Sequence, residues 1–62
     1  MNREQIMEVI RELARSQGFY GRLYQDFCYL QENEPETLER IFEELEAQKF
    51  VDTLDVVLYF ER

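Results

Sequence analysis

The sequence has no histidine, no tryptophan, one cysteine, one proline and two glycines in 62 residues. A single cysteine excludes an intramolecular disulfide, and without histidine the ordinary ligand sets for zinc are incomplete. Nucleophilic catalysis that depends on an imidazole base is excluded for the same reason. A lone thiol and the lack of a secretory leader favour a reducing compartment, so we expect a cytoplasmic protein.

Long apolar runs are also missing. The longest run, Val56 to Phe60, has five residues, whereas a membrane-spanning helix needs about 20. We therefore expect no membrane span. The chain, residues 1–62, is too short for two cores and is expected to form one small helical domain. A domain of this size buries only about 60% of the surface of its unfolded chain, which favours further stabilisation by a partner.

Basic residues are scarce and unevenly placed. Seven Lys and Arg oppose fourteen Asp and Glu, for a net charge of -7. Residues 1–24 hold four Arg and three Glu, a net of +1, so residues 25–62 carry -8. Nucleic acids and anionic membranes attract clustered Lys and Arg. The chain has no such cluster, so we expect it to bind neither directly.

Apolar residues that recur at intervals of three and four predict amphipathic helices. The predicted helices span about 3–16, 19–31 and 35–48. Asn2 and Gln5 have the spacing of a capping box, Gly18 is placed to stop a helix in the left-handed conformation, and Pro35 suits a first helical position. The short link predicts that the first two helices form an antiparallel hairpin. The predicted common core is Ile10, Leu13, Leu23, Phe27, Leu38, Ile41, Phe42 and Leu45.

The C-terminal segment is predicted to be a short apolar helix over 53–61. Asp52 is a suitable N-cap, Asp55 occupies the third helical position, and Val51 and Val56 have the spacing of a hydrophobic staple. The alternative is a strand, because the segment is rich in β-branched and aromatic residues. A single strand would find nothing to pair with in this chain. The sequence therefore predicts an all-α fold of three to four short helices.

One stretch of the sequence carries a resemblance. It is the run Ser16-Gln17-Gly18-Phe19-Tyr20-Gly21-Arg22-Leu23, followed later by Gln48-Lys49-Phe50 and by Asp52-x-x-Asp55 before an apolar tail. This pattern resembles a group of short, acidic, uncharacterised proteins carried on mobile elements of Gram-positive bacteria. The resemblance implies an accessory or regulatory role in a conjugative or phage-like element. It implies no activity, cofactor or partner.

Residues that could carry chemistry have simpler structural interpretations. Glu39, Glu43 and Glu46 share a face of the third predicted helix that has no apolar neighbours, so we interpret them as a solvated acidic surface. The carboxylates around Glu44 lack the glycine turn of a calcium loop, and we assign no metal. Cys28 has no base to activate it and is interpreted as a buried structural thiol. We expect no enzyme activity and no cofactor.

The segment from Gly18 to Tyr24 concentrates tyrosine and arginine, the residue types that dominate protein-binding hot spots. The competing interpretation is a tight interhelical corner whose rings fill a small core. Arg22 is the strongest single candidate, because an arginine among aromatic rings can stack and still donate to an acidic partner. The candidate partner-binding residues are Phe19, Tyr20, Arg22, Tyr24, Tyr59 and Phe60.

Nine Phe and Tyr side chains exceed what four short helices can easily hide. Exposed apolar patches usually mark interaction surfaces, so the sequence predicts a homodimer that uses the apolar segment Val56 to Phe60. The leading functional hypothesis is a self-associating protein-interaction or regulatory module. The alternative is an acidic decoy whose carboxylates imitate a phosphate backbone and occupy a basic groove of a nucleic-acid-binding protein.

Overall fold

The computed structural model describes residues 1–61, and this range contains four helices and no strand. The helices are α1 (Arg3–Leu13), α2 (Gly18–Asn33), α3 (Pro35–Ala47) and α4 (Thr53–Phe60). The all-α prediction is confirmed, including a helix rather than a strand in the C-terminal segment. None of these described helices is both long and apolar enough to span a membrane.

Helix α1 begins at the predicted capping box. The Asn2 side chain accepts a hydrogen bond from the Gln5 amide at 2.9 Å, and the Gln5 side chain accepts one from the Asn2 amide at 3.0 Å. Two backbone donors that the first helical turn leaves without partners are thereby satisfied. Met1, the residue before the cap, packs against the core.

Helix α1 ends earlier than predicted, at Leu13, and the role predicted for Gly18 is wrong. No glycine among residues 1–61 has a positive φ, and Gly18 is instead the first residue of α2. The turn is closed by backbone hydrogen bonds, including one of 3.1 Å from the Gln17 amide to the Leu13 carbonyl. Gln17 then adopts an extended conformation with φ of -133°. The chain therefore reverses without a left-handed residue.

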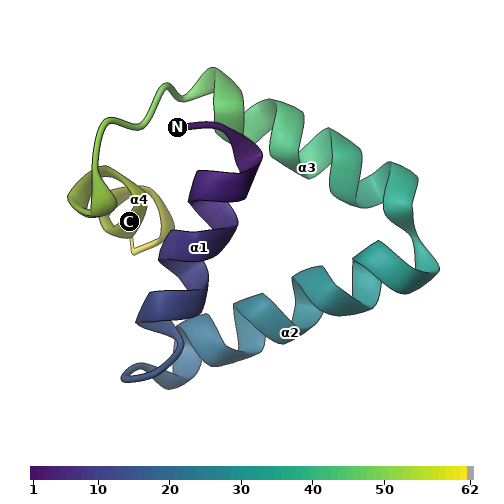
Figure 1. Cartoon of the computed structure of the whole chain (residues 1–62), viewed down its shortest axis with the longest axis horizontal. Helices are drawn as coiled ribbons and strands as arrows, with labels where there is room; N and C mark the ends of the chain where they lie inside the picture. Colours follow the sequence, from purple (N-terminus) through teal and green to yellow (C-terminus); the bar gives the residue numbers. More distant parts are fainter. Residues whose placement is uncertain (62) are drawn as a thin grey trace.

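A single residue, Glu34, separates α2 from α3. Its amide donates to the Leu30 carbonyl at 2.7 Å, and its own carbonyl accepts from the Leu38 amide at 3.2 Å. Pro35 follows at the first position of α3, where its missing N–H costs nothing and its fixed φ suits the helix. This shared cap produces the sharp α2–α3 corner seen in Figure 1.

The first three helices form three sides of an open triangle, and α4 lies on the outer side of α1 (Figure 1). The antiparallel hairpin predicted for the first two helices is not confirmed, because α1 and α2 diverge from the turn at residues 14–17 in this view. Helix α1 contacts all three other helices. It is therefore the element around which the domain is assembled.

The link from α3 to α4 contains the one residue in the described chain, other than glycine, with a positive φ. Lys49 has a φ of 55°, in the left-handed region that favours glycine. Next, the Asp52 side chain caps α4 by accepting from the Asp55 amide at 3.1 Å, and the Asp55 side chain accepts from the Val51 amide at 2.8 Å. The predicted staple does not form, since Val56 is fully buried but Val51 remains exposed.

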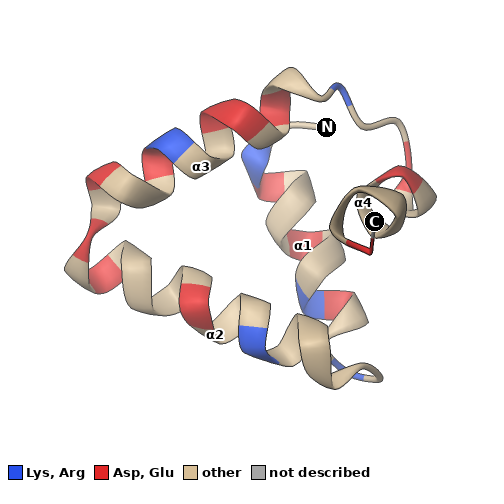
Figure 2. Ribbon diagram, turned by 180° about the vertical axis from the view of Figure 1, so that it is seen from behind, with Lys and Arg blue, Asp and Glu red and all other residues tan. Residues whose placement is uncertain are grey.

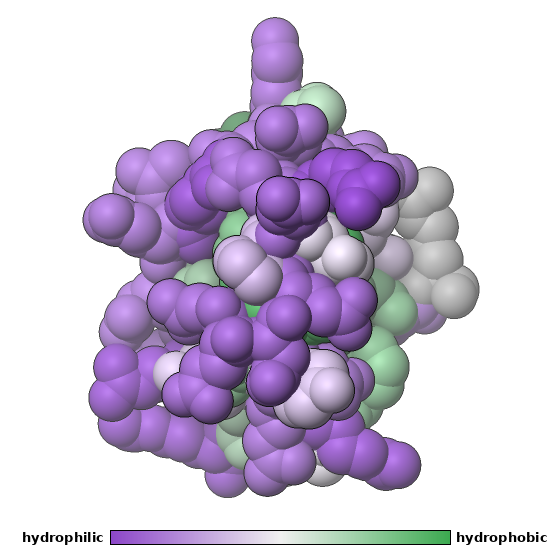
Figure 3. Space-filling model, turned by 90° about the vertical axis from the view of Figure 1, so that its right-hand side faces the viewer, coloured by the Kyte–Doolittle hydropathy of each residue, from purple (hydrophilic) through white to green (hydrophobic). Residues whose placement is uncertain are grey.

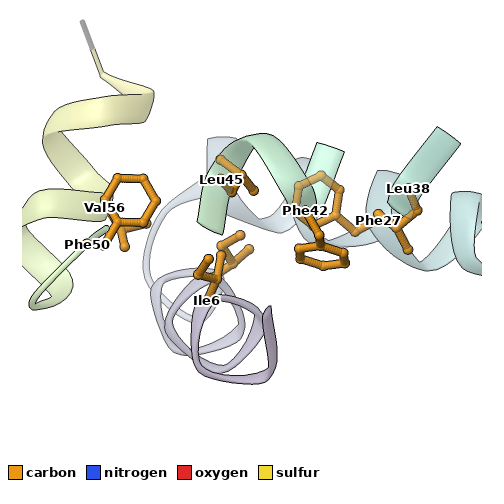
Figure 4. Packing of buried hydrophobic residues seen from close by; sticks show 8 residues of the cluster. Ile6, Phe27, Leu38, Phe42, Leu45, Phe50 and Val56 are labelled. Carbon is orange, nitrogen blue, oxygen red and sulfur yellow. The ribbon is translucent and has the colours of Figure 1, made fainter. Parts of the chain in front are cut away.

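One continuous hydrophobic cluster joins the four helices (Figure 4). Of the predicted core, Ile10 and four residues of α2 and α3 are buried, whereas Leu13, Leu23 and Ile41 are half-buried. Besides Tyr20 of α2, three buried residues, Ile6, Phe50 and Val56, were outside that prediction. They join α1 to the α3–α4 link and to α4, as Figure 4 shows for Phe50 beside Val56. The buried cluster is Ile6, Ile10, Phe27, Leu38, Phe42, Leu45, Phe50 and Val56.

Candidate functional site

Four of the six candidate residues meet in one row of rings, although the sequence places them about 40 positions apart. We call this set the aromatic row; its members, in order, are Phe19, Tyr20, Phe60, Tyr59 and Phe50. Successive ring centroids are 5.1, 6.4, 5.1 and 5.5 Å apart, and every pair is edge-to-face. Aromatic pairs prefer this geometry because a positive ring edge meets a negative ring face. The row packs the start of α2 against the end of α4.

The position of Tyr20 corrects its assignment as a partner-binding residue. Its side chain is fully buried, and its hydroxyl donates to a Glu61 carboxylate oxygen at 3.3 Å. Burial, together with the negative charge and hydrogen bond of Glu61, raises the pKa of Tyr20 above its ordinary value. Tyr20 is thus a core residue, as the competing interpretation of an interhelical corner expected.

The other candidates differ in accessibility. Phe19 is 50% exposed in the first turn of α2, and Arg22 is exposed one turn later. Tyr24 packs half-buried against the core, as do Tyr59 and Phe60. Of the six candidates, only Phe19 and Arg22 are therefore exposed. Cys28, expected to be buried, is half-buried on α2.

A second surface, not singled out from the sequence, lies on the outer side of α4. Val51, Leu54 and Leu58 are 82%, 61% and 58% exposed; we call these three residues the aliphatic stripe. Leu54 and Leu58 are four positions apart and so share a helix face. The hydrogen bond from the Val51 amide to Asp55 ties the start of the stripe to the first turn of α4. Residues 1–61 thus leave more than half of each of these three residues uncovered.

Electrostatic contacts between helices centre on Arg3. Its guanidinium bridges Glu39 and Glu46 of α3, the latter at 2.9 Å, and lies 5.6 Å above the centre of the Phe42 ring. The hydrogen bonds from Arg3 lower the pKa of Glu39, and those to both carboxylates raise the pKa of Arg3. Of the solvated acidic face predicted for α3, Glu39 and Glu43 are exposed, Glu46 is half-buried, and both Glu39 and Glu46 are paired with Arg3.

Beside this network, α1, α2 and α3 enclose an open groove of about 360 Å³. We call it the triangle groove; its walls are Arg3, Glu4, Met7, Gln31, Leu38 and Phe42. An adjoining hollow of about 240 Å³ shares four of these residues and adds Pro35 and Glu39. Figure 3, which faces the α2–α3 corner, shows hydrophilic side chains over most of that side with smaller apolar areas between them.

Residues 1–61 contain no group of three or more Cys, His, Asp or Glu side chains placed to hold a metal ion. Among these residues, apolar side chains or hollows at the surface include the aliphatic stripe, the triangle groove, Tyr29 and the exposed end of the aromatic row. The apolar run from Val56 to Phe60 indicated only Leu58 of the stripe, because Val51 and Leu54 lie before that run. No pattern in the sequence indicated the groove, because its walls come from three separate helices.

Comparisons with protein-family models, with curated proteins and with solved structures each gave no match to this chain, so its function must be argued from its own geometry.

Proposed function

We propose that this chain is a small protein-interaction module that self-associates by packing the aliphatic stripe of one copy against that of a second. The observation that carries the proposal is the exposure of Leu54 and Leu58 on α4 and of Val51 just before it, while Val56 of the same helix is completely buried. A helix that is apolar on both sides needs two covering surfaces. Its own domain supplies one, and an identical stripe related by a two-fold axis supplies the other.

The magnitudes limit such a dimer to weak association. Covering a largely exposed Val or Leu side chain gains about 1 to 2 kcal/mol, so six side chains from two copies contribute about 6 to 12 kcal/mol. Association costs about 4 to 15 kcal/mol in lost translational and rotational freedom. Only the upper end of the gain, about 12 kcal/mol, set against a cost of about 5 to 8 kcal/mol leaves a surplus, and that surplus corresponds to a dissociation constant on the order of 10⁻⁵ to 10⁻³ M. Self-association is thus a property of concentrated protein or of copies held near one another.

Charge gives the dimer a distinctive salt dependence. Each copy carries a net charge of -7, so two copies repel each other at low ionic strength. Added salt screens this repulsion and leaves the apolar contact in place. We therefore expect self-association to strengthen between low and physiological salt.

Sedimentation equilibrium over tens to hundreds of micromolar tests the proposal. The expected result is a concentration-dependent mass that rises from 7.6 kDa toward twice that value, and Leu58→Glu should abolish the rise. The matched control is Gln25→Glu, which adds the same charge at an exposed position of α2 and should leave the association unchanged. A mass of 7.6 kDa at every concentration, or equal loss in both variants, refutes self-association through the stripe.

A second candidate function, the acidic decoy, is favoured by a different observation. Glu36, Glu43 and Glu44 on α3 are exposed, and no ion pair reaches them within residues 1–61. Figure 2 shows acidic residues along α3 and at the α2–α3 corner, and Arg40 is the one basic residue in the sequence of α3. Against the decoy, Arg3 interrupts the row by binding Glu39 and Glu46.

The salt dependence of binding distinguishes the two candidate functions. A decoy bound to a basic groove loses affinity as salt rises, because its binding is mainly electrostatic. Basic proteins can be purified from a host lysate on heparin-Sepharose and then passed over the immobilised chain. The proteins that bind are candidate targets. The decoy requires that Glu43→Gln and Glu44→Gln weaken capture, whereas Leu58→Glu leaves it intact. The reverse pattern assigns the capture to α4.

A further inference from the structure

The triangle groove combines an apolar floor with an acidic rim, and we propose that it binds an apolar side chain presented by a basic helical segment of another protein. This surface is separate from the aliphatic stripe, since none of its walls comes from α4. The inference therefore extends the function beyond self-association to a second, chemically different partner.

The floor of the groove is built by three apolar side chains from two helices. Leu38 and Phe42 of α3 are buried core residues whose outer edges line the groove, and Met7 of α1 is half-buried beside them. Methionine is unbranched and adapts its shape to a neighbour, which suits a surface that accepts an incoming side chain. A volume of about 360 Å³ falls in the range of pockets that bind small apolar groups. It accommodates one or two large aliphatic side chains.

The rim determines the charge of the occupant. The groove and the adjoining hollow are bordered by one cation, Arg3, and by Glu4 and Glu39. Arg3 is also bound to Glu46, so this set of four charged groups has a net charge of -2. The single cation is therefore already engaged, and Glu4 has no ion pair with any described residue. Lysine or arginine flanking an apolar anchor would meet these carboxylates, whereas an acidic segment would be repelled.

A second copy of this chain is a poorer occupant. Its exposed aliphatic residues lie on segment 51–58, where Asp52 and Asp55 flank them. Entry of that segment would bring two carboxylates toward Glu4 and Glu39, and like charges at such an interface are unfavourable. The occupant with matching chemistry is thus an amphipathic helix of opposite charge, which places anchors at intervals of three and four.

Nuclear magnetic resonance titration of the full chain with a designed probe tests this inference. The probe is an amidated peptide of about 14 residues, with leucine at helical spacing and lysine elsewhere. Amide signals of Met7, Gln31 and Leu38 should shift and saturate. Replacing every lysine of the probe with glutamate should abolish the shifts, and so should replacing every leucine with alanine, because binding needs both the anchor and the charge.

A pair of matched variants locates the rim contact. Glu4→Gln and Glu8→Gln each remove one carboxylate from an exposed position of α1, but only Glu4 lines the groove. Glu4→Gln should weaken the affinity for the probe about two- to fivefold, which is the usual effect of losing an exposed ion pair. Glu8→Gln should leave the affinity unchanged. Equal weakening by both variants would indicate a polycation bound to the whole acidic surface and would overturn the proposal.

The stripe variant keeps this test independent of self-association. In Leu58→Glu the groove is intact, so the probe should bind as it does to the unsubstituted chain. Shifts centred on Leu54 and Leu58 in the unsubstituted chain, lost in Leu58→Glu, would show that the peptide occupies α4 and would overturn the groove assignment. Failure of the dimer with retention of groove binding would refute only the proposed function.

Discussion

Replacing Lys49 with glycine should stabilise the domain, even though it removes a side chain. Lys49 follows α3 with a φ of 55°, where the Cβ of an L-residue crowds its own backbone. Its side chain is exposed and forms no ion pair within residues 1–61. The folded state therefore loses nothing specific when this side chain is removed.

Two opposing terms set the size of the effect. Relief of the left-handed conformation gains about 1 to 2 kcal/mol, and the greater freedom of glycine in the unfolded chain costs about 0.5 to 1 kcal/mol. We expect a net gain of about 0.5 to 1 kcal/mol in the free energy of unfolding. For a domain of this size each kcal/mol moves Tm by about 4 to 8 °C, so Tm should rise by about 2 to 8 °C.

Urea unfolding followed by circular dichroism, with Lys49→Ala as the matched control, provides the assay. Both substitutions remove the same positive charge, but only glycine removes the Cβ. The free energy of unfolding should therefore increase for glycine and stay level or fall for alanine. If the two variants have equal stability, or if glycine is the less stable, the left-handed conformation of Lys49 is not a source of strain and the reasoning fails.

Three further predictions concern the helices and the aromatic row. Gly21→Ala should raise the free energy of unfolding by about 1 kcal/mol, because an added Cβ would meet only the Ala14 carbonyl oxygen, at 3.9 Å; a loss of stability in urea would contradict this. Phe42→Ala should cost about 3 to 5 kcal/mol, most of what a domain of this length possesses, and unchanged thermal unfolding would remove Phe42 from the core. The raised pKa of Tyr20 means that above about pH 10 the unfolded state loses this proton before the folded state does, so stability should fall as pH rises. Tyr20→Phe should flatten that decline in alkaline unfolding curves, and an identical decline in both proteins would assign it to other groups.

The helices were predictable because their signals are local. The capping box at Asn2 and the cap at Asp52 each involve residues three positions apart, and Pro35 can begin a helix whatever surrounds it. Helix ends were less predictable. The backbone of residues 14–17 could close a turn without the left-handed glycine that Gly18 suggested, since alternative hydrogen bonds were available.

Burial depends on which helices meet, and periodicity alone does not contain that information. Tyr20 looked like a binding residue until Phe60 and Glu61, about 40 positions later, covered it. Nothing local in the sequence pairs Arg3 with Glu39, and only the packing of α1 against α3 brings the two together. Within the apolar run from Val56 to Phe60 only Leu58 is exposed, whereas the predicted binding residues Tyr59 and Phe60 are half-buried.

The central position of α1 has a consequence during protein synthesis. Val56 follows Ile6 by 50 positions, and both side chains are completely buried in one cluster. A ribosome that adds about 5 to 20 residues per second needs about 2 to 10 s to make that interval. Helical domains pack in microseconds to milliseconds once the whole chain is present. The rate of translation, rather than the rate of packing, therefore determines how long the apolar face of α1 remains available to chaperones and proteases.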